Sequence, residues 1–201
     1  MVLFLELIFF LAIGYYIYQF VQVLFRLGHH VVLPISEKEL LGIRKHPDKL
    51  IYHPIFSRQK RGIIFYSCLL LFIVTMFFLL FFFREEDSIN WLLNVMFLLP
   101  LTYSDDILNL FAIVDDGILS GNRFISWNKI KDVQFIPIDM NHRFYGFNKE
   151  VNNGYELKVK GRFRSTSCVV MSDEMKDKLT EIISEKANIQ VNEAMKEVSI
   201  K

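Results

Sequence analysis

Cysteine is scarce in this sequence, and neither sign of charge is in excess. Two cysteines in 201 residues exclude a small disulfide-rich secreted scaffold. A formal net charge of +1 argues against a nucleic-acid-binding protein, because such domains usually carry a clear basic excess. The length allows one or two modest domains.

Charged residues are also missing from two long apolar stretches. Residues 3–25 contain a single acidic or basic residue, Glu6, and residues 62–83 contain none. As a helix, the second stretch reaches roughly 33 Å at about 1.5 Å per residue, enough for a hydrocarbon core of about 30 Å. The first stretch lacks the basic start and the small-residue cleavage site of a signal peptide. We expect both to be transmembrane helices, and thirteen of the twenty phenylalanines precede residue 84.

A third apolar stretch, residues 89–103, is interrupted by Asn90, Asn94 and Pro100. It is barely long enough to cross a bilayer, so it spans with a kink, tilts, or rests at the interface. The sequence therefore predicts a third helix here but does not decide whether that helix spans the membrane.

Charge on the connections predicts the orientation. Residues 34–61 hold seven basic and three acidic residues, whereas residues 84–87, Arg-Glu-Glu-Asp, carry a net charge of −2. Basic connections favour the cytosol, so the N-terminus is expected outside and the C-terminal half inside. Cys168 should then resist a membrane-impermeant maleimide in intact cells.

The composition after residue 105 becomes that of a solvated domain with alternating apolar and polar residues. Asp115-Asp116-Gly117 is a hairpin signal between apolar runs, and Ser120-Gly121-Asn122 is a second turn or bulge. Residues 130–138, 155–160 and 163–171 are predicted as further strands. Pro137 ends the first of these or places it at an edge. About five strands are expected in total.

An amphipathic helix is predicted to close this domain. Ser172 is the expected N-cap, and Met175, Leu179 and Ile183 lie on one apolar face together with Ile182. The organisation expected from the sequence is therefore a first transmembrane helix (1–33), a basic cytosolic linker (34–61), a transmembrane hairpin (62–104), a β domain with a C-terminal helix (105–188) and a tail (189–201).

One part of the β domain carries a family resemblance. The stretch from Asp116-Gly117-Ile118 through Phe124-Ile125-Ser126-Trp127-Asn128-Lys129-Ile130, followed by the amphipathic helix, resembles bacterial PH-like (pleckstrin-homology-like) domains of small membrane proteins. The resemblance covers about a third of the chain. It implies an open PH-like barrel, a location in the bacterial cell membrane, and a scaffold or interaction module without catalytic residues. Some such proteins are tied to bacteriocin self-protection.

The residues that could carry chemistry form no recognisable motif. The five histidines lack the spacings of zinc sites, and no serine-hydrolase, Walker or dinucleotide pattern is present. We therefore expect no catalytic residue, metal or cofactor. Asp105-Asp106 and Asp115-Asp116 could form a carboxylate pair, but their positions favour a membrane exit and a hairpin turn. The histidines are His29, His30, His46, His53 and His142.

Two sets of residues are predicted to bind partners. The basic run Lys158, Lys160, Arg162 and Arg164 could touch anionic lipid, at about 1 kcal/mol per close charge, or form a solvated sheet face. In the first helix a polar stripe is expected to contact the other two helices or a partner membrane protein. The stripe consists of Glu6, Gly14, Tyr18, Gln22 and Arg26, with Tyr15 and Gln19 beside it.

The leading hypothesis is a non-enzymatic, multi-pass membrane protein whose cytosolic domain binds another membrane protein or the lipid surface. Self-immunity to a membrane-active bacteriocin is one version that the resemblance implies. The alternative is a membrane enzyme or transport-complex subunit that uses Glu6, Asp105, Asp106 and the juxtamembrane histidines.

Overall fold

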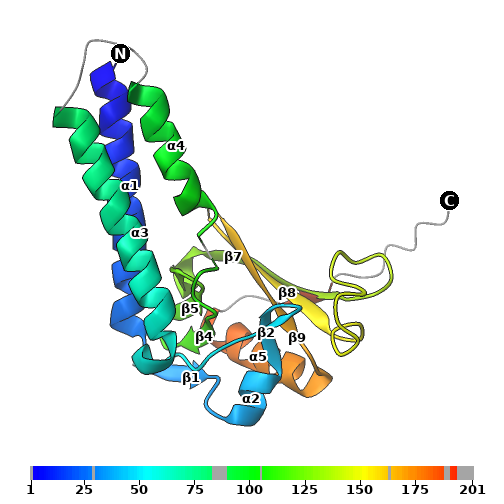
Figure 1. The fold of residues 1–201 in the computed structure, drawn as a ribbon. Coiled ribbons are helices and arrows are strands. Elements are labelled where there is room, and N and C mark those ends of the chain that lie inside the picture. The colour runs from blue at the N-terminus through cyan, green and yellow to red at the C-terminus, as the bar shows by residue number, and fades with distance from the viewer. Residues whose placement is uncertain are drawn as a thin grey trace.

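The computed structural model describes residues 2–28, 30–82, 90–104, 106–162, 164–187 and 191–193. Two long helices lie side by side, a shorter helix runs along their upper half, and a β domain packs beside their lower half (Figure 1). The expectations for Asp105, Phe163, His29 and the connection 84–87 fall outside the described residues.

The long helices are α1 (Val2–Arg26) and α3 (Phe56–Phe82). Within the described residues, these are the two helices long and apolar enough to cross a membrane. Only 22% and 28% of their most apolar windows are buried, whereas the core helix of a soluble protein is mostly buried. Large apolar side chains such as Phe10, Phe65 and Phe72 are instead exposed. Two long apolar helices with exposed apolar side chains are consistent with association with a membrane.

The expected third span forms α4 (Asn90–Thr102), a helix of 13 residues that contains Pro100. At about 1.5 Å per residue it is roughly 20 Å long, shorter than a hydrocarbon core of about 30 Å. Leu101, near its end, is fully buried against the other helices, and Tyr103 just beyond it is 87% exposed. α4 thus ends at about the middle of the helix pair (Figure 1).

The first sheet has the strand order β1-β4-β5-β6 and is antiparallel throughout. Asp115 and Asp116 form the two-residue turn between β4 and β5, as the sequence predicted. Gly121, in the next turn, has a φ of 57°, which glycine adopts without strain. The strands are β1 (Val31–Leu33), β4 (Phe111–Val114), β5 (Gly117–Ser120) and β6 (Arg123–Ser126).

The second sheet has the order β10-β7-β8-β9-β2-β3 and is antiparallel except for the parallel β10–β7 pair. A 3-10 turn at Trp127–Lys129 joins it to the first sheet, and Pro137 ends β7. The strands are β2 (Ile43–His46), β3 (Lys49–Leu50), β7 (Ile130–Pro137), β8 (Tyr155–Gly161), β9 (Ser165–Val170) and β10 (Asn192–Glu193).

Residues 34–61, predicted as a basic linker, contribute structure to the β domain. They contain α2 (Glu37–Leu41), β2 and β3. The hydroxyl of Ser36 accepts a hydrogen bond from the Glu39 amide, and the Glu39 carboxylate accepts one from the Ser36 amide, which forms a capping box. β2 then pairs with β9, so this segment adds strands to a sheet that otherwise comes from the C-terminal half.

The predicted C-terminal helix is α5 (Asp173–Ala187). Its N-cap is Ser172, whose hydroxyl accepts a hydrogen bond from the Met175 amide at 3.3 Å. Met175, Leu179 and Ile183 are buried, as the periodicity predicted. They complete a core between the two sheets.

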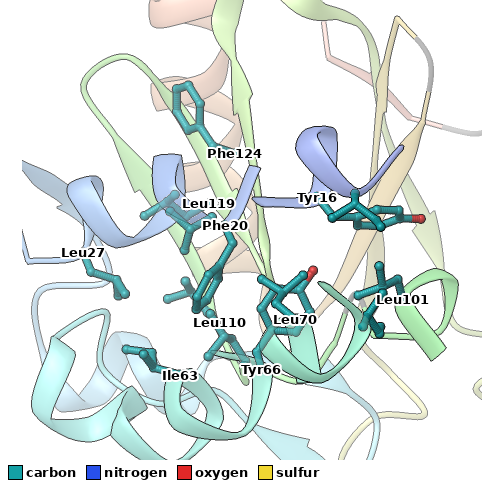
Figure 2. Close-up of a cluster of buried hydrophobic side chains, with 14 of the residues drawn as sticks. Tyr16, Phe20, Leu27, Ile63, Tyr66, Leu70, Leu101, Leu110, Leu119 and Phe124 are labelled. Atoms are coloured by element: carbon teal, nitrogen blue, oxygen red, sulfur yellow. The ribbon is translucent and has the colours of Figure 1, made fainter. Parts of the chain in front are cut away.

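A second core joins the helices to the first sheet. Phe20 of α1 and Tyr66 of α3 meet edge to face with ring centroids 4.6 Å apart, and Leu110, Leu119 and Phe124 of the sheet segment belong to the same cluster (Figure 2). The opposite face of this sheet contributes to the core between the sheets. The two long apolar helices and the β domain therefore share one hydrophobic interior, in which each buried side chain of this size stabilises by about 1.5–3 kcal/mol.

Candidate functional site

Lys45 is the most unusual residue of the β domain, because its ammonium group is buried. Its side chain is 5% exposed. The Nζ atom lies 2.8 Å from Ser120 Oγ, 3.3 Å from Thr166 Oγ1 and 3.2 Å from the Ser167 carbonyl oxygen. It also lies 3.1 Å from Asp106 Oδ1. Burial of an ammonium is tolerated only with partners of this kind.

Asp106 supplies the negative charge of this cluster. One carboxylate oxygen faces Lys45, and the other lies 3.1 Å from His46 Nε2. Burial alone raises the pKa of Asp106, but Lys45 and His46 outweigh this, so the pKa lies below its usual range. Asp106 is therefore a carboxylate at neutral pH.

The cluster borders a cavity of about 140 Å³. A water molecule needs roughly 10–15 Å³ of such space, so the cavity can hold several waters or one tetrahedral anion. Arg123 adds a second cation to the wall, and Ser165 adds a further hydroxyl. Among the residues that the structure describes, the wall therefore combines the cations Lys45 and Arg123 with the Asp106 carboxylate, His46 and several hydroxyl groups.

The neighbouring polar groups hold Asp106 in place. Asn122 donates a hydrogen bond to the Ser104 carbonyl oxygen and accepts one from the Leu108 amide at 3.3 Å. Ser104 Oγ donates to the Leu101 carbonyl oxygen at the end of α4. These bonds tie the end of α4 to the β5–β6 turn and set the position of Asp106 between them.

The geometry suits binding better than catalysis. A lysine beside a serine at 2.8 Å is the arrangement of a serine–lysine dyad. A lysine that acts as a base needs a free lone pair, but Lys45 has a carboxylate and three other oxygens within 3.3 Å for its three protons. Lys45 thus fixes hydroxyl groups and contributes charge.

The predicted basic run lies on the β8–β9 hairpin beside this cavity. Lys160 forms an ion pair with Asp132 at 3.0 Å, and Lys158 is partly buried. Arg162 and Arg164, at the turn, are exposed to solvent. The Arg164 guanidinium carbon lies 5.9 Å from the ring centroid of Tyr16 in α1, so the turn approaches the middle of that helix.

The predicted stripe on α1 divides into two parts. Gly14 and Tyr18 are exposed, and Gln22 donates a hydrogen bond to the Tyr18 hydroxyl at 2.6 Å. Arg26 contacts the β domain through an ion pair with Asp116 at 2.8 Å. The face that α1 buries is apolar instead and contains Phe9, Ile13, Tyr16 and Phe20.

The described histidines form ion pairs or hydrogen bonds with carboxylates and are not gathered around one point. Among the residues that the structure describes, no group of three or more potential metal ligands is found. The closest nitrogen–oxygen pairs are His30 with Asp115 at 3.3 Å, His46 with Asp106 at 3.1 Å, His53 with Glu37 at 3.4 Å, and His142 with Glu156 at 2.9 Å.

Glu156 is a buried carboxylate on β8, within residues 155–160 that the sequence predicted as a strand. It is 3% exposed and lies 2.9 Å from His142 Nε2 and 2.5 Å from Arg143 Nη2. Burial raises the pKa of Glu156, but Arg143, Ser167 and His142 together hold it below its usual value. This cluster fastens the loop between β7 and β8.

Cys168 is buried at 1% exposure, and burial raises the pKa of its thiol to about 12. A maleimide reacts with the thiolate, so this residue resists labelling on either side of a membrane. The proposed labelling of Cys168 therefore cannot report the topology.

Lys45, Ser120, Arg123 and Thr166 are site residues that sequence reasoning missed. They come from β2, β5, the start of β6 and β9, and no local spacing connects them. The available signal was Lys45 two positions after the apolar Ile43, the spacing that places two side chains on one face of a strand, in a segment assigned to a linker.

Comparison of the chain with protein-family models, with curated proteins and with solved structures finds no match.

Proposed function

We propose that this chain is a non-enzymatic integral membrane protein of a bacterial cell membrane, whose PH-like β domain binds partners at the cytosolic surface. The partner is the lipid surface or another membrane protein, and self-immunity to a membrane-active bacteriocin is one concrete version. The observation that supports this most is the shared core of Phe20, Tyr66 and Leu110 (Figure 2). It fixes the β domain beside the apolar helices, where a membrane would lie.

The positions of the helix ends support the proposed topology. The start of α1, the end of α3 and the start of α4 lie together, opposite the β domain (Figure 1). Arg58, Lys60 and Arg61 lie at the other end, in the first turns of α3. Basic residues favour the cytosolic side, so the β domain is cytosolic and the N-terminus is outside.

The proposed topology can be tested with a cysteine at an exposed position of the β domain. Met140 is 81% exposed, so Met140→Cys in a Cys68→Ala background provides a reactive thiol. A membrane-impermeant maleimide should label it only after the cells are permeabilised, while the buried Cys168 stays unlabelled in both samples. Labelling in intact cells would overturn the proposed orientation.

The binding function can be tested by photo-crosslinking from the β8–β9 turn. A photoreactive amino acid at Arg162 should capture lipid or an integral membrane protein in native membranes. The matched control is the same probe at Lys149, an exposed residue of the loop between β7 and β8. Equal capture of lipid and membrane protein at the two positions would contradict a specific surface at the turn.

A second candidate function, a membrane hydrolase, is favoured by one observation, the 2.8 Å approach of Lys45 Nζ to Ser120 Oγ. A fluorophosphonate probe, which labels an activated serine, distinguishes the hydrolase from the binding protein. Labelling of the wild type that disappears in Ser120→Ala would establish the hydrolase, and the binding proposal expects no Ser120-dependent labelling.

A further inference from the structure

The connection between β7 and β8, residues 138–154, is long and forms no helix or strand, yet it packs around a core of its own. Connections of more than about 12–15 residues without secondary structure are uncommon, and most of them are either functional or disordered. In this loop Ile138 and Val151 are buried against Val169 of β9. The loop therefore has a defined shape, which favours a functional role.

Buried charge and a side-chain hydrogen bond also hold the loop in place. The buried Glu156 carboxylate of β8 contacts both His142 and Arg143 of the loop. Asn152 Oδ1 accepts a hydrogen bond from the Gly146 amide at 2.9 Å, which joins the two halves of the loop. A surface that has its shape before a partner arrives loses less conformational entropy on binding.

The loop nevertheless exposes large apolar side chains, namely Met140, Tyr145 and Phe147. Scattered exposed apolar residues are ordinary, but three so close together on a loop that is held in place are typical of an interaction surface. The loop lies at the end of the β domain away from α1 and α3 (Figure 1). The surface is therefore separate from the apolar helices and suits a water-soluble partner.

An open groove of about 360 Å³ lies between this loop and the adjoining ends of β7 and β8. Its volume falls in the range of ligand sites, roughly 300–1,000 Å³. Asp139 contributes a carboxylate to the wall, and none of the lining residues is a lysine, arginine or histidine. The other lining residues are Pro137, Ile138, Met140, Tyr145, Asn152, Asn153, Gly154 and Tyr155.

A carboxylate beside aromatic rings is an arrangement that binds a cationic side chain. Asp139 Oδ1 accepts a hydrogen bond from the Asn141 amide at 3.1 Å, which orients the carboxylate. The ring of Tyr155 already has one cation against it, because Lys176 Nζ lies 4.6 Å from the ring centroid. Tyr145 is exposed to solvent. A guanidinium is planar, so it can pair with a carboxylate and stack on a tyrosine ring at once.

We propose that this groove binds a segment of a water-soluble protein that presents an arginine next to an apolar residue. The arginine pairs with Asp139 and stacks on Tyr145, and its apolar neighbour packs on Met140. The side-chain amides of Asn152 and Asn153 hydrogen-bond to the main chain of the segment. This interaction goes beyond the membrane-surface function proposed above and does not depend on the orientation in the membrane.

Titration of the full-length protein in detergent micelles with a labelled peptide tests the proposal. The probe is acetyl-Gly-Leu-Arg-Leu-Gly-amide, and the matched peptide carries citrulline in place of arginine, which keeps the planar group but removes its charge. Fluorescence anisotropy should give a dissociation constant about fivefold lower for the arginine peptide, as expected for an exposed ion pair. Equal affinity of the two peptides, or no binding of either, would overturn the proposal.

Variants of the wall locate the binding site. Asp139→Asn should abolish the difference between the two peptides, and Tyr145→Ala should weaken binding of the arginine peptide about tenfold. Glu181→Gln, which removes an exposed carboxylate outside the groove, should change neither. Protection of the buried Cys168 from maleimide verifies that each variant is folded. Unchanged affinities in folded Asp139→Asn and Tyr145→Ala would overturn the site.

A photoreactive amino acid at Met140 distinguishes the other possible occupants. Cross-linking to the arginine peptide in preference to the citrulline peptide would support the proposal. A cross-link into residues 194–201 of the same chain would instead assign the groove to the protein's own C-terminal segment. A cross-link to a second copy would assign it to self-association. Either of these two results would overturn the assignment to a partner protein.

Discussion

The Arg26 guanidinium and the Asp116 carboxylate form an ion pair of 2.8 Å between the last residue of α1 and the β4–β5 turn, ninety positions apart in the chain. The same guanidinium lies 3.7 Å above the ring centroid of Phe124. Arg26 therefore joins the end of a long apolar helix to the first sheet by two different interactions.

Substitutions at the two ends of this pair should differ in effect. Asp116 is 55% exposed, so Asp116→Asn should lower the free energy of unfolding by about 0.5 kcal/mol or less. Arg26→Ala also removes the contact with Phe124 and should cost about 1–2 kcal/mol. Denaturant unfolding in detergent measures both. Equal losses would contradict the role assigned to the Phe124 contact.

Gly62 allows the close approach of α3 to the segment before β4. A Cβ atom there would lie 2.7 Å from Leu108 Cδ2 and 3.2 Å from the Ile107 carbonyl oxygen. Gly62→Ala should therefore force the helix and the β domain apart. Gly14→Ala in α1 is a matched control, because its Cβ would meet no atom within 4 Å.

Both alanines gain helix propensity, so the difference between them isolates packing. We expect Gly62→Ala to be less stable than Gly14→Ala by about 2 kcal/mol, measured as the free energy of unfolding in detergent. If the two variants were equally stable, the contact between α3 and the β domain would not be tight in solution.

Glu156 should make stability depend on pH. Its pKa in the folded protein lies below the ordinary value of 4.5, so the folded state binds its proton less readily than the unfolded chain. The stabilisation is present above about pH 4.5 and is lost as the pH falls through the folded pKa.

Comparison with Glu156→Gln isolates this contribution. At pH 7 the variant should be about 2 kcal/mol less stable, because the contacts of the carboxylate with His142 and Arg143 lose their charge. The difference should shrink in acid. Glu181→Gln, on the exposed face of α5, should match the wild type at both pH values. A difference for Glu156→Gln that does not change with pH would contradict the assignment.

The sequence predicted an element correctly where the residues that determine it lie close together in the chain. The Asp115-Asp116 turn, the cap at Ser172 and the apolar face of α5 were predicted correctly because their determinants lie within a few residues. The same holds for the two long apolar helices. The predicted PH-like identity of the β domain stays a proposal.

Sequence reasoning did not find the strands within residues 34–61 or the buried Lys45. β2 is four residues long and obtains its place by pairing with β9, more than a hundred residues later. Lys45 lies in the segment predicted as a basic linker, where a solvated lysine is the ordinary expectation. Only pairing with β9 brings Thr166 and Ser167 to its ammonium group.

The sequence alone therefore determined the apolar helices, the turns and the capped helix, because hydrophobic periodicity and turn chemistry act over short distances. The tertiary structure decided that a basic segment becomes a strand, that the first sheet packs on α1 and α3, and that cations and hydroxyls from β2, β5, β6 and β9 border one cavity. Those relationships depend on strand pairing and on the burial of shared apolar faces. Both involve segments that are distant in the chain, so they cannot be predicted from a short stretch of sequence.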